Sequence, residues 1–329
     1  MATYKEIRGT NIEVVSSDPD NPVTGQVWFN STDNVLKAST GPLTAAWASG
    51  NNMNTARQIM SNFGIQTAAI SAGGFQEGAS PGREALTESY NGTNWTEVND
   101  LNSGRSGVAG AGTQTAGLAA GGFSPALSPP RATETETWNG TNWTEVNDLN
   151  TGRSSLAGAG TSTAGLVAGG LDPSTAATAD TELYNGTNWT EVNNLNAARY
   201  NAAGSGATNT AALNFGGTGS PKAKTELWNG TNWTEVNDLN SARESLTGSG
   251  TSTASLGFGG ESGDKAMTES WNGTSWTETS DLNTGRKNMG ENGSGTTSTL
   301  ALAQGGTPPQ TAATEEFTVA GGTVTFTDS

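Results

Sequence analysis

Residues 105–150 read RSGVAGAGTQTAGLAAGGFSPALSPPRATETETWNGTNWTEVNDLN, and this segment recurs along the chain. An arginine opens it, a Gly-Gly pair follows, and a Thr-Glu-x-aromatic-Asn-Gly sequence precedes a tryptophan. The tryptophans are spaced by 48, 48, 46, 44 and 43 residues: Trp47, Trp95, Trp143, Trp189, Trp233 and Trp276. The glycine pairs keep the same period: Gly73-Gly74, Gly121-Gly122, Gly169-Gly170, Gly216-Gly217, Gly259-Gly260 and Gly305-Gly306. The chain therefore contains six tandem units of about 46 residues.

Each unit has four segments with the composition of β-strands. Residues 105–112 are small and suit a crowded inner strand, and residues 116–122 form a second strand that ends at the glycine pair. Residues 135–138 and 141–146 flank Asn139-Gly140, which is a strong hairpin signal because a type I′ turn requires positive φ at both central residues. Asn-Gly recurs at Asn91-Gly92, Asn185-Gly186, Asn229-Gly230 and Asn272-Gly273. Repeats of this length, with four strands each, are typical of β-propeller blades.

The tryptophan of each unit falls on the fourth predicted strand. One indole ring buries a large apolar area, so we expect these rings to pack between adjacent blades. A tryptophan can also line a sugar site, but six copies at one structural position favour the core. The structural tryptophans of the complete units are Trp95, Trp143, Trp189, Trp233 and Trp276.

A charged pair also recurs in every unit. The arginines that open the first strand are Arg57, Arg105, Arg153, Arg199, Arg243 and Arg286. The glutamates that open the third strand are Glu88, Glu136, Glu182, Glu226, Glu269 and Glu316. We expect a repeated link from arginine to a carboxylate or to the backbone. The alternative is a ring of arginines that binds an anion near the axis, which a net charge of −16 disfavours.

Composition limits the classes of function. The 329 residues are only 32% hydrophobic and include 46 glycines, which suits thin blades better than one large core. Fifteen basic against 31 acidic residues argue against a nucleic-acid partner. The chain has no Cys and no His, so we expect no disulfide, no metal site and no cofactor. No apolar run approaches the roughly 20 residues of a membrane span, and no secretory signal is recognisable, so we expect neither membrane insertion nor secretory export.

The ends of the chain bear on how the ring closes. Six pairs of first and second strands predict six blades, and seven blades is the alternative. Residues 36–47 and 317–326 each resemble a hairpin, and one of them is expected to complete the last blade. A blade that joins strands from both chain ends would leave no exposed edge. The fold class is therefore all-β, with a short N-terminal β extension or anchoring segment at residues 1–45 and a propeller at 46–329.

The order of Arg, Gly-Gly, Thr-Glu-x-aromatic and Trp over about residues 45–329 resembles kelch repeats, which form β-propellers. Some kelch propellers are enzymes of the galactose oxidase type. Their copper site requires His and a Cys–Tyr link. This chain has no His and no Cys. The resemblance thus implies a propeller without that activity.

A second resemblance lies near the N-terminus. Residues 20–37, DNPVTGQVWFNSTDNVLK, resemble a short module of tailed-phage fibre and other virion proteins, including those of marine phages with kelch-like tandem repeats. This implies a non-enzymatic virion protein: a tail fibre, a tail-associated protein or a decoration component. The N-terminal segment would bind other virion proteins, the propeller would serve host attachment through a surface glycan or protein, and homo-oligomers are left open.

The loops after the glycine pairs differ from unit to unit, whereas the Asn-Gly hairpins are nearly identical. One face of the propeller is therefore expected to be diversified, as ligand-binding faces are. The charged residues of these loops are the candidate ligand-binding residues: Arg83, Arg131, Asp172, Lys222, Lys224, Asp264 and Lys265. Their basic members favour an anionic glycan or an acidic neighbour.

An enzyme remains the alternative from another class. The Asn-Gly hairpins faintly resemble the Asp boxes of six-bladed sialidases, with Tyr200 beside Arg199 as the candidate nucleophile. Carboxylates are plentiful, but none forms a unique pair of the kind that glycoside hydrolysis requires. The candidates are Glu97, Glu145, Asp148, Asp180 and Asp264. Calcium at Asp18 or Asp20 is a further alternative, although no twelve-residue calcium loop is present.

Overall fold

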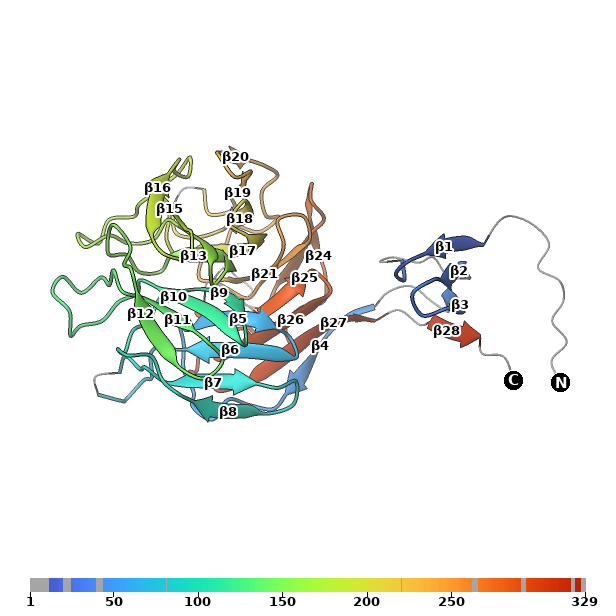
Figure 1. Cartoon of the computed structure of the whole chain (residues 1–329), viewed down its shortest axis with the longest axis horizontal. Helices are drawn as coiled ribbons and strands as arrows, with labels where there is room; N and C mark the ends of the chain where they lie inside the picture. Colours follow the sequence, from blue (N-terminus) through green and yellow to red (C-terminus); the bar gives the residue numbers. More distant parts are fainter. Residues whose placement is uncertain are drawn as a thin grey trace, which may run out of the picture. The chain divides into compact units, whose positions relative to one another are not determined.

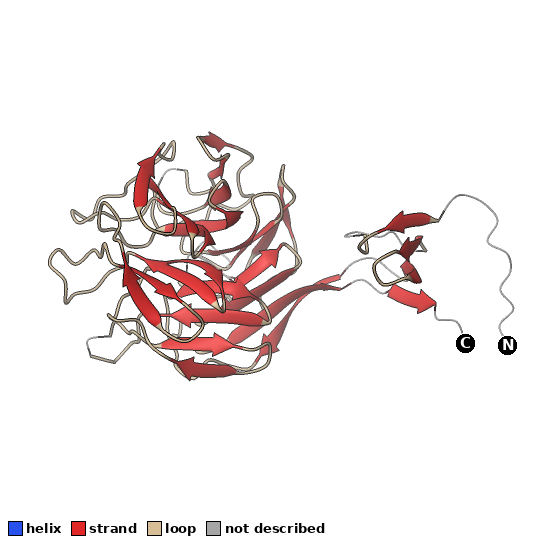
Figure 2. Cartoon of the chain, viewed as in Figure 1, coloured by secondary structure: helices blue, strands red, loops and turns tan. Residues whose placement is uncertain are grey.

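The computed structural model describes residues 12–19, 25–39, 44–80, 82–219, 221–261, 266–290, 294–320 and 323–326. All regular secondary structure in these ranges is β-strand (Figures 1 and 2). The chain divides into two compact units. The larger is Trp47–Thr318, and the smaller joins Met1–Ala46 to Val319–Ser329.

Five of the blades in the larger unit are continuous in sequence, each an antiparallel sheet with its strands in chain order. The first blade is β5 (Ser61–Ile65), β6 (Ala68–Ala72), β7 (Thr87–Tyr90) and β8 (Trp95–Val98). The second is β9 (Ala109–Thr113), β10 (Ala116–Ala120), β11 (Thr135–Trp138) and β12 (Trp143–Val146). The third is β13 (Ala157–Thr161), β14 (Ala164–Ala168), β15 (Thr181–Tyr184) and β16 (Trp189–Val192). The fourth is β17 (Ala203–Thr208), β18 (Ala211–Phe215), β19 (Thr225–Trp228) and β20 (Trp233–Glu235). The fifth is β21 (Thr247–Gly250), β22 (Ser255–Phe258), β23 (Thr268–Trp271) and β24 (Trp276–Glu278).

The sixth blade takes strands from both ends of the chain. Its order is β25 (Ser294–Thr297), β26 (Leu300–Gln304), β27 (Thr314–Ala320) and β4 (Thr44–Gly50). First strands of consecutive blades contact one another around the ring, and β25 contacts β5. The predicted all-β propeller is therefore confirmed, with six blades and a last blade joined from both ends. Neither terminal hairpin stays together, because each contributes one strand to the blade and one to the smaller unit.

The smaller unit holds the seventh four-stranded sheet, which is not a blade. Its order is β1 (Glu13–Val15), β2 (Val27–Asn30), β3 (Val35–Ser39) and β28 (Thr323–Phe326). The Asp18 carboxylate accepts hydrogen bonds from Trp28 Nε1 at 3.0 Å, Asn30 Nδ2 at 2.8 Å and Lys37 Nζ at 2.8 Å. The propeller was expected to run to residue 329, but Val319–Ser329 groups with the N-terminal segment because β28 pairs with β3.

The recurrent arginine and the glycine pair set the boundaries of the two inner strands of a blade. In the second blade the inner strand begins at Ala109, four residues later than expected from position 105, because the N–H of Arg105 bonds to Glu84 O and Ser106 bridges to Phe123. The strand β10 ends before Gly121, where φ is +69°. Glycine tolerates this conformation without a steric penalty, which explains the recurrent pair.

The outer-strand tryptophans connect neighbouring blades. Each indole N–H donates to a threonine hydroxyl on the third strand of the preceding blade, over 2.9–3.1 Å. The pairs are Trp95–Thr314, Trp143–Thr87, Trp189–Thr135, Trp233–Thr181, Trp276–Thr225 and Trp47–Thr268. The rings are only 5–6% exposed. They pack between blades, and they therefore do not offer a surface for stacking a sugar.

Glycines let the blades approach closely. A Cβ atom added to Gly117 would lie 2.2 Å from Cε2 of Phe63, whose ring comes from the preceding blade. Real Cβ atoms do not come this close to another heavy atom, so the large ring and the missing side chain are complementary. This complementarity explains how a sequence low in hydrophobic residues fills the space between its blades.

Candidate functional site

The recurrent arginines are structural groups. In the second blade, Arg105 Nη1 donates to the carbonyl oxygens of Gly121 at 2.8 Å and Glu134 at 2.7 Å. Its Nη2 donates to Glu136 Oε1 at 2.5 Å. The other carboxylate oxygen of Glu136 accepts from the backbone and side-chain nitrogens of Asn102. Arg105 thus links the segments of its blade that contain Gly121, Glu134 and Glu136. Through the Glu136 carboxylate it is also linked to Asn102, in the connection from the first blade.

The same ion pair occurs six times, over 2.5–3.0 Å, with arginines that are 0–3% exposed. The pairs are Arg57–Glu88, Arg105–Glu136, Arg153–Glu182, Arg199–Glu226, Arg243–Glu269 and Arg286–Glu315. Burial lowers the pKa of the Arg57 guanidinium, and the nearby Glu88 carboxylate opposes this. Because these guanidinium groups are buried and bonded inside the blades, the alternative of an anion-binding ring near the axis is wrong.

The carboxylate of the sixth pair is Glu315, whereas the sequence predicted Glu316 at this position. The register of β27 aligns Thr314-Glu315 with the Thr-Glu of the other blades, since Ala303 pairs with Glu315 as Ser71 pairs with Glu88. Successive side chains of a strand point to opposite faces, so Glu316 points elsewhere. It accepts a hydrogen bond from the Tyr90 hydroxyl of the first blade, and burial together with this carboxylate raises the pKa of Tyr90.

A closed ring of backbone hydrogen bonds links the six blades. The residue two positions after each arginine donates its N–H to the carbonyl oxygen of its counterpart in the preceding blade, over 2.6–3.1 Å. The members are Ile59, Gly107, Ser155, Asn201, Ser245 and Asn288. All six have φ between +52° and +64°. This ring was not predicted from the sequence, because apart from Gly107 and the two asparagines its residues carry no signal for positive φ.

Beside this ring, on the face of the variable loops, two arginines and two phenylalanines form an alternating stack. The Arg83 guanidinium carbon lies 4.3 Å from the ring centroid of Phe75 and 5.1 Å from that of Phe123. Arg131 lies 4.7 Å from the Phe123 centroid. Backbone bridges hold each arginine beside the phenylalanine of its own blade. In the third blade the same two positions are Leu171 and Ala177, so the stack breaks the repeat.

A pocket of about 290 Å³ opens at this stack. Arg83, Phe123 and Arg131 line it together with Leu171 and three serines, Ser106, Ser154 and Ser155. Burial lowers the pKa of both guanidinium groups, which nevertheless remain protonated near neutral pH because arginine starts from about 12.5 or above. Within the described residues, neither arginine has a carboxylate at salt-bridge distance. The pocket therefore presents two cations that form no ion pair within the described residues, although the Asp172 carboxylate is near enough to Arg131 to raise its pKa.

The other predicted ligand residues are placed differently. Asp172 Oδ1 accepts from the N–H groups of Ser174 and Ala176 and from the Ser174 hydroxyl, so it organises its own turn. These bonds lower the pKa of Asp172. Lys222 pairs with Glu244 at 3.0 Å, and Lys224 pairs with Glu235. Asp264 and Lys265 lie outside the described residues. Of the seven candidates, the structure brings Arg83 and Arg131 together.

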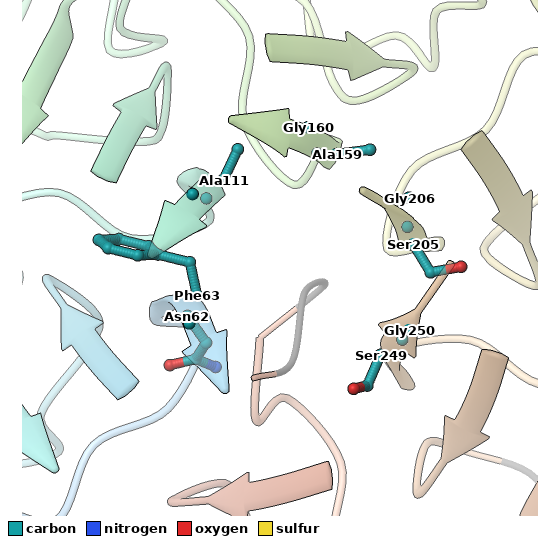
Figure 3. Close-up of a pocket in the computed structure, with 15 residues that line it drawn as sticks. Asn62, Phe63, Ala111, Ala159, Gly160, Ser205, Gly206, Ser249 and Gly250 are labelled. Carbon is teal, nitrogen blue, oxygen red and sulfur yellow. The ribbon is translucent and has the colours of Figure 1, made fainter. Parts of the chain in front are cut away.

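A second cavity lies among the inner strands (Figure 3). Its volume is about 60 Å³, and glycine, alanine and serine dominate its lining. Asn62 Nδ2 donates to Met289 O, and Ser205 Oγ accepts from Ser255. The described lining residues include no charged side chain, and the volume of this cavity has room for a few water molecules.

The candidate catalytic residues stay apart. Glu97 and Glu145 are exposed on the outer strands β8 and β12, each opposite the buried glutamate of its blade. Asp148 accepts from Thr133, and Asp180 accepts from Asn194, which follows the outer strand of the same blade. Tyr200 bridges to Thr218 through its backbone. Its neighbour Arg199 is buried against Glu226, so it is not available to a substrate there.

Neither a metal site nor a membrane-spanning helix is found in the described part of the chain. Among these residues, no group of three or more acidic side chains is placed to hold a metal ion. Asp18 is bonded to Trp28, Asn30 and Lys37, whereas Asp20 lies outside the described residues. No helix long and apolar enough to span a membrane occurs within the described ranges.

Comparison with known proteins supports the fold. No protein-family model and no curated protein matches the chain. The solved structure of the protein YjhT matches with a TM-score of 0.66 at 11% sequence identity. The match covers 83% of this chain and 99% of that one. At this identity the similarity concerns the propeller architecture alone.

Proposed function

We propose that this protein is a non-enzymatic structural component of a tailed-phage virion that displays its propeller for binding a host-surface or protein ligand. The observation that carries the ligand-binding part is the Phe75–Arg83–Phe123–Arg131 stack. Everything that recurs six times is used within or between blades, whereas this stack departs from the repeat and lines a pocket. A repeat-breaking cluster on a rigid scaffold is typical of recognition surfaces.

The virion part of the proposal rests on the smaller unit. Its Trp28-Phe29-Asn30 strand belongs to the segment that resembles phage fibre modules. Trp28 is fully buried, and Asp18 joins it to Asn30 and Lys37. Both ends of the propeller chain enter this unit, because β3 and β28 pair there while β4 and β27 complete the last blade. We therefore assign docking onto other virion proteins to the smaller unit and ligand binding to the propeller.

Immunogold labelling of purified particles tests the location. An antibody raised against the whole chain is expected to label the tail or its fibres. Label spread over the capsid would instead favour a decoration component. Particles without label would contradict the virion assignment and leave a free binding module or enzyme to be considered. Binding of the isolated protein to host cells then separates attachment from a purely architectural role.

A further inference from the structure

We propose that the pocket lined by residues of the first three blades binds a sugar residue that carries one anionic group, a carboxylate or a sulfate. The Arg83 and Arg131 guanidinium groups would hold the anion, and the serines of the pocket would bond to neighbouring hydroxyl groups. This inference rests on the proposed function, because it names the ligand class of the same face.

The geometry of the stack supports an anion site. The Arg83 guanidinium lies over the rings of both Phe75 and Phe123, and these two contacts restrict its position before a ligand arrives. Its N–H groups lie in the guanidinium plane, where they remain oriented for a planar or tetrahedral oxyanion. The Arg131 guanidinium likewise lies over the ring of Phe123, at 4.7 Å from its centroid. Two pre-positioned guanidinium groups bind an anion at a small cost in side-chain entropy.

Charge across the loop face makes the site selective. In the fourth to sixth blades, two described lysines of this face are paired: Lys222 with Glu244, and Lys287 with Glu261. Arg83 and Arg131, by contrast, form no ion pair within the described residues, and only Arg131 has a carboxylate, Asp172, near enough to affect its pKa. The net charge of −16 opposes extended polyanions such as nucleic acids or long acidic peptides. A saccharide can deliver one anion into the pocket and keep neutral hydroxyl groups elsewhere.

The remaining lining suits a polyhydroxylated ring. Ser106, Ser154 and Ser155 supply hydroxyl groups that both donate and accept hydrogen bonds. Leu171 and Ile59 add a small apolar area. A pocket of about 290 Å³ is close to the lower limit of about 300 Å³ for small-molecule sites, which favours one sugar residue at a time.

Calorimetric titration of the whole chain tests the assignment with four probes. These are tetrasaccharides of galacturonic acid, sulfated galactose and neutral galactose, and a peptide of four glutamates. The expected result is binding of one or both anionic tetrasaccharides and of neither other probe, with an affinity that falls as salt rises. The two anionic probes distinguish carboxylate from sulfate. Binding of neither anionic sugar, equal binding of the neutral one, preference for the peptide, or affinity independent of salt would overturn the proposal.

Variants locate the site. Arg83→Gln and Arg131→Gln should each weaken the anionic sugar by about tenfold or more, since each removes a charge-assisted contact. Lys222→Gln, on the same face but paired with Glu244, is the matched control and should change affinity less than about twofold. Equal effects of all three substitutions on affinity would refute the assignment to this pocket. If a variant does not fold, the salt dependence of binding by the unmodified protein still tests the proposal that the ligand is anionic. Sugar binding by a protein absent from particles would overturn only the virion assignment, and labelled particles without sugar binding would overturn only the ligand.

Discussion

The indole N–H of Trp143 donates a 3.1 Å hydrogen bond to the hydroxyl of Thr87, a residue of the preceding blade that is 0% exposed. Six such bonds run around the ring, and the last two use Trp47 from the N-terminal end and Thr314 from the C-terminal end. Each blade is thus held to its neighbour by the same polar contact inside an apolar interface. This relationship makes the stability of the ring accessible to single substitutions.

Thr87→Val keeps the side-chain volume but removes the acceptor of Trp143. A buried indole N–H without a partner should lower the free energy of unfolding by about 1–3 kcal/mol. Thr96→Val, at an exposed position of β8, is the control and should change it by less than about 0.5 kcal/mol. Urea unfolding followed by tryptophan fluorescence measures both, and equal effects would mean that the bond contributes nothing.

Glu136→Gln tests the buried ion pair. The change leaves the Arg105 charge buried without its carboxylate, so we expect the free energy of unfolding to fall by about 3–5 kcal/mol. Glu145→Gln is the matched control, since Glu145 lies directly opposite on β12 and is exposed. Chemical denaturation of the two variants measures the loss in the free energy of unfolding at each position. A loss at position 136 no larger than at position 145 would contradict a structural role for the pair.

Gly117→Ala tests the close approach of the blades. The new methyl group would meet Phe63, and overpacking of this kind should cost about 1–3 kcal/mol. Shortening the neighbour with Phe63→Leu should make the double variant less destabilised than the sum of the single changes. Thermal unfolding of the four proteins of this cycle gives the coupling, and strict additivity would show that the two residues do not oppose each other.

The smaller unit should respond to acid through Asp18. Its hydrogen bond to Lys37, helped by Asn30 and Trp28, lowers the pKa of Asp18 to about 2 from 3.8. A lowered folded-state pKa contributes stability that is present above pH 3.8 and is lost as pH falls through about 2. The indole N–H resonance of Trp28, identified with Trp28→Phe, should therefore move with a midpoint near pH 2. A midpoint near 3.8 would indicate that the Asp18 contacts are not formed in solution.

The repeat was sufficient to predict the blades because each depends on local patterns. The third strand of the second blade was expected at residues 135–138 and lies at Thr135–Trp138. The type I′ turn expected at Asn139-Gly140 was wrong, because only Gly140 has a positive φ and Trp138 pairs with Trp143, which leaves a four-residue loop at 139–142. Boundaries that depend on other segments were wrong. The inner strand begins at Ala109 instead of residue 105, and Glu315 replaces Glu316, because interstrand bonds and register decide both.

The candidate site was predictable only as a set of basic residues on variable loops. The sequence sets the loops of Arg83 and Arg131 apart from that of Lys222 and Lys224 only by a shared spacing of Phe-x7-Arg, at residues 75–83 and 123–131. This spacing does not show which groups are close in space. The distinction depends on which carboxylates and aromatic rings lie within a few ångströms. Lys222 has Glu244 as its neighbour, whereas Arg83 has Phe75 and Phe123.

The sequence by itself determined the repeated unit, the four-strand composition of each blade and the tryptophans that pack between blades, and it favoured six blades over seven. These properties follow from turn chemistry and side-chain alternation, which act over a few residues and are repeated in every unit. Only the tertiary structure decided that strands from both chain ends complete the last blade, where β28 pairs and which basic side chains form no ion pair. Those outcomes depend on contacts between distant residues. Arg83 and Phe123 are separated by 40 positions in the sequence, and Trp95 and Thr314 by 219. No local pattern specifies the partners in such contacts, because they meet only when separate blades pack against each other.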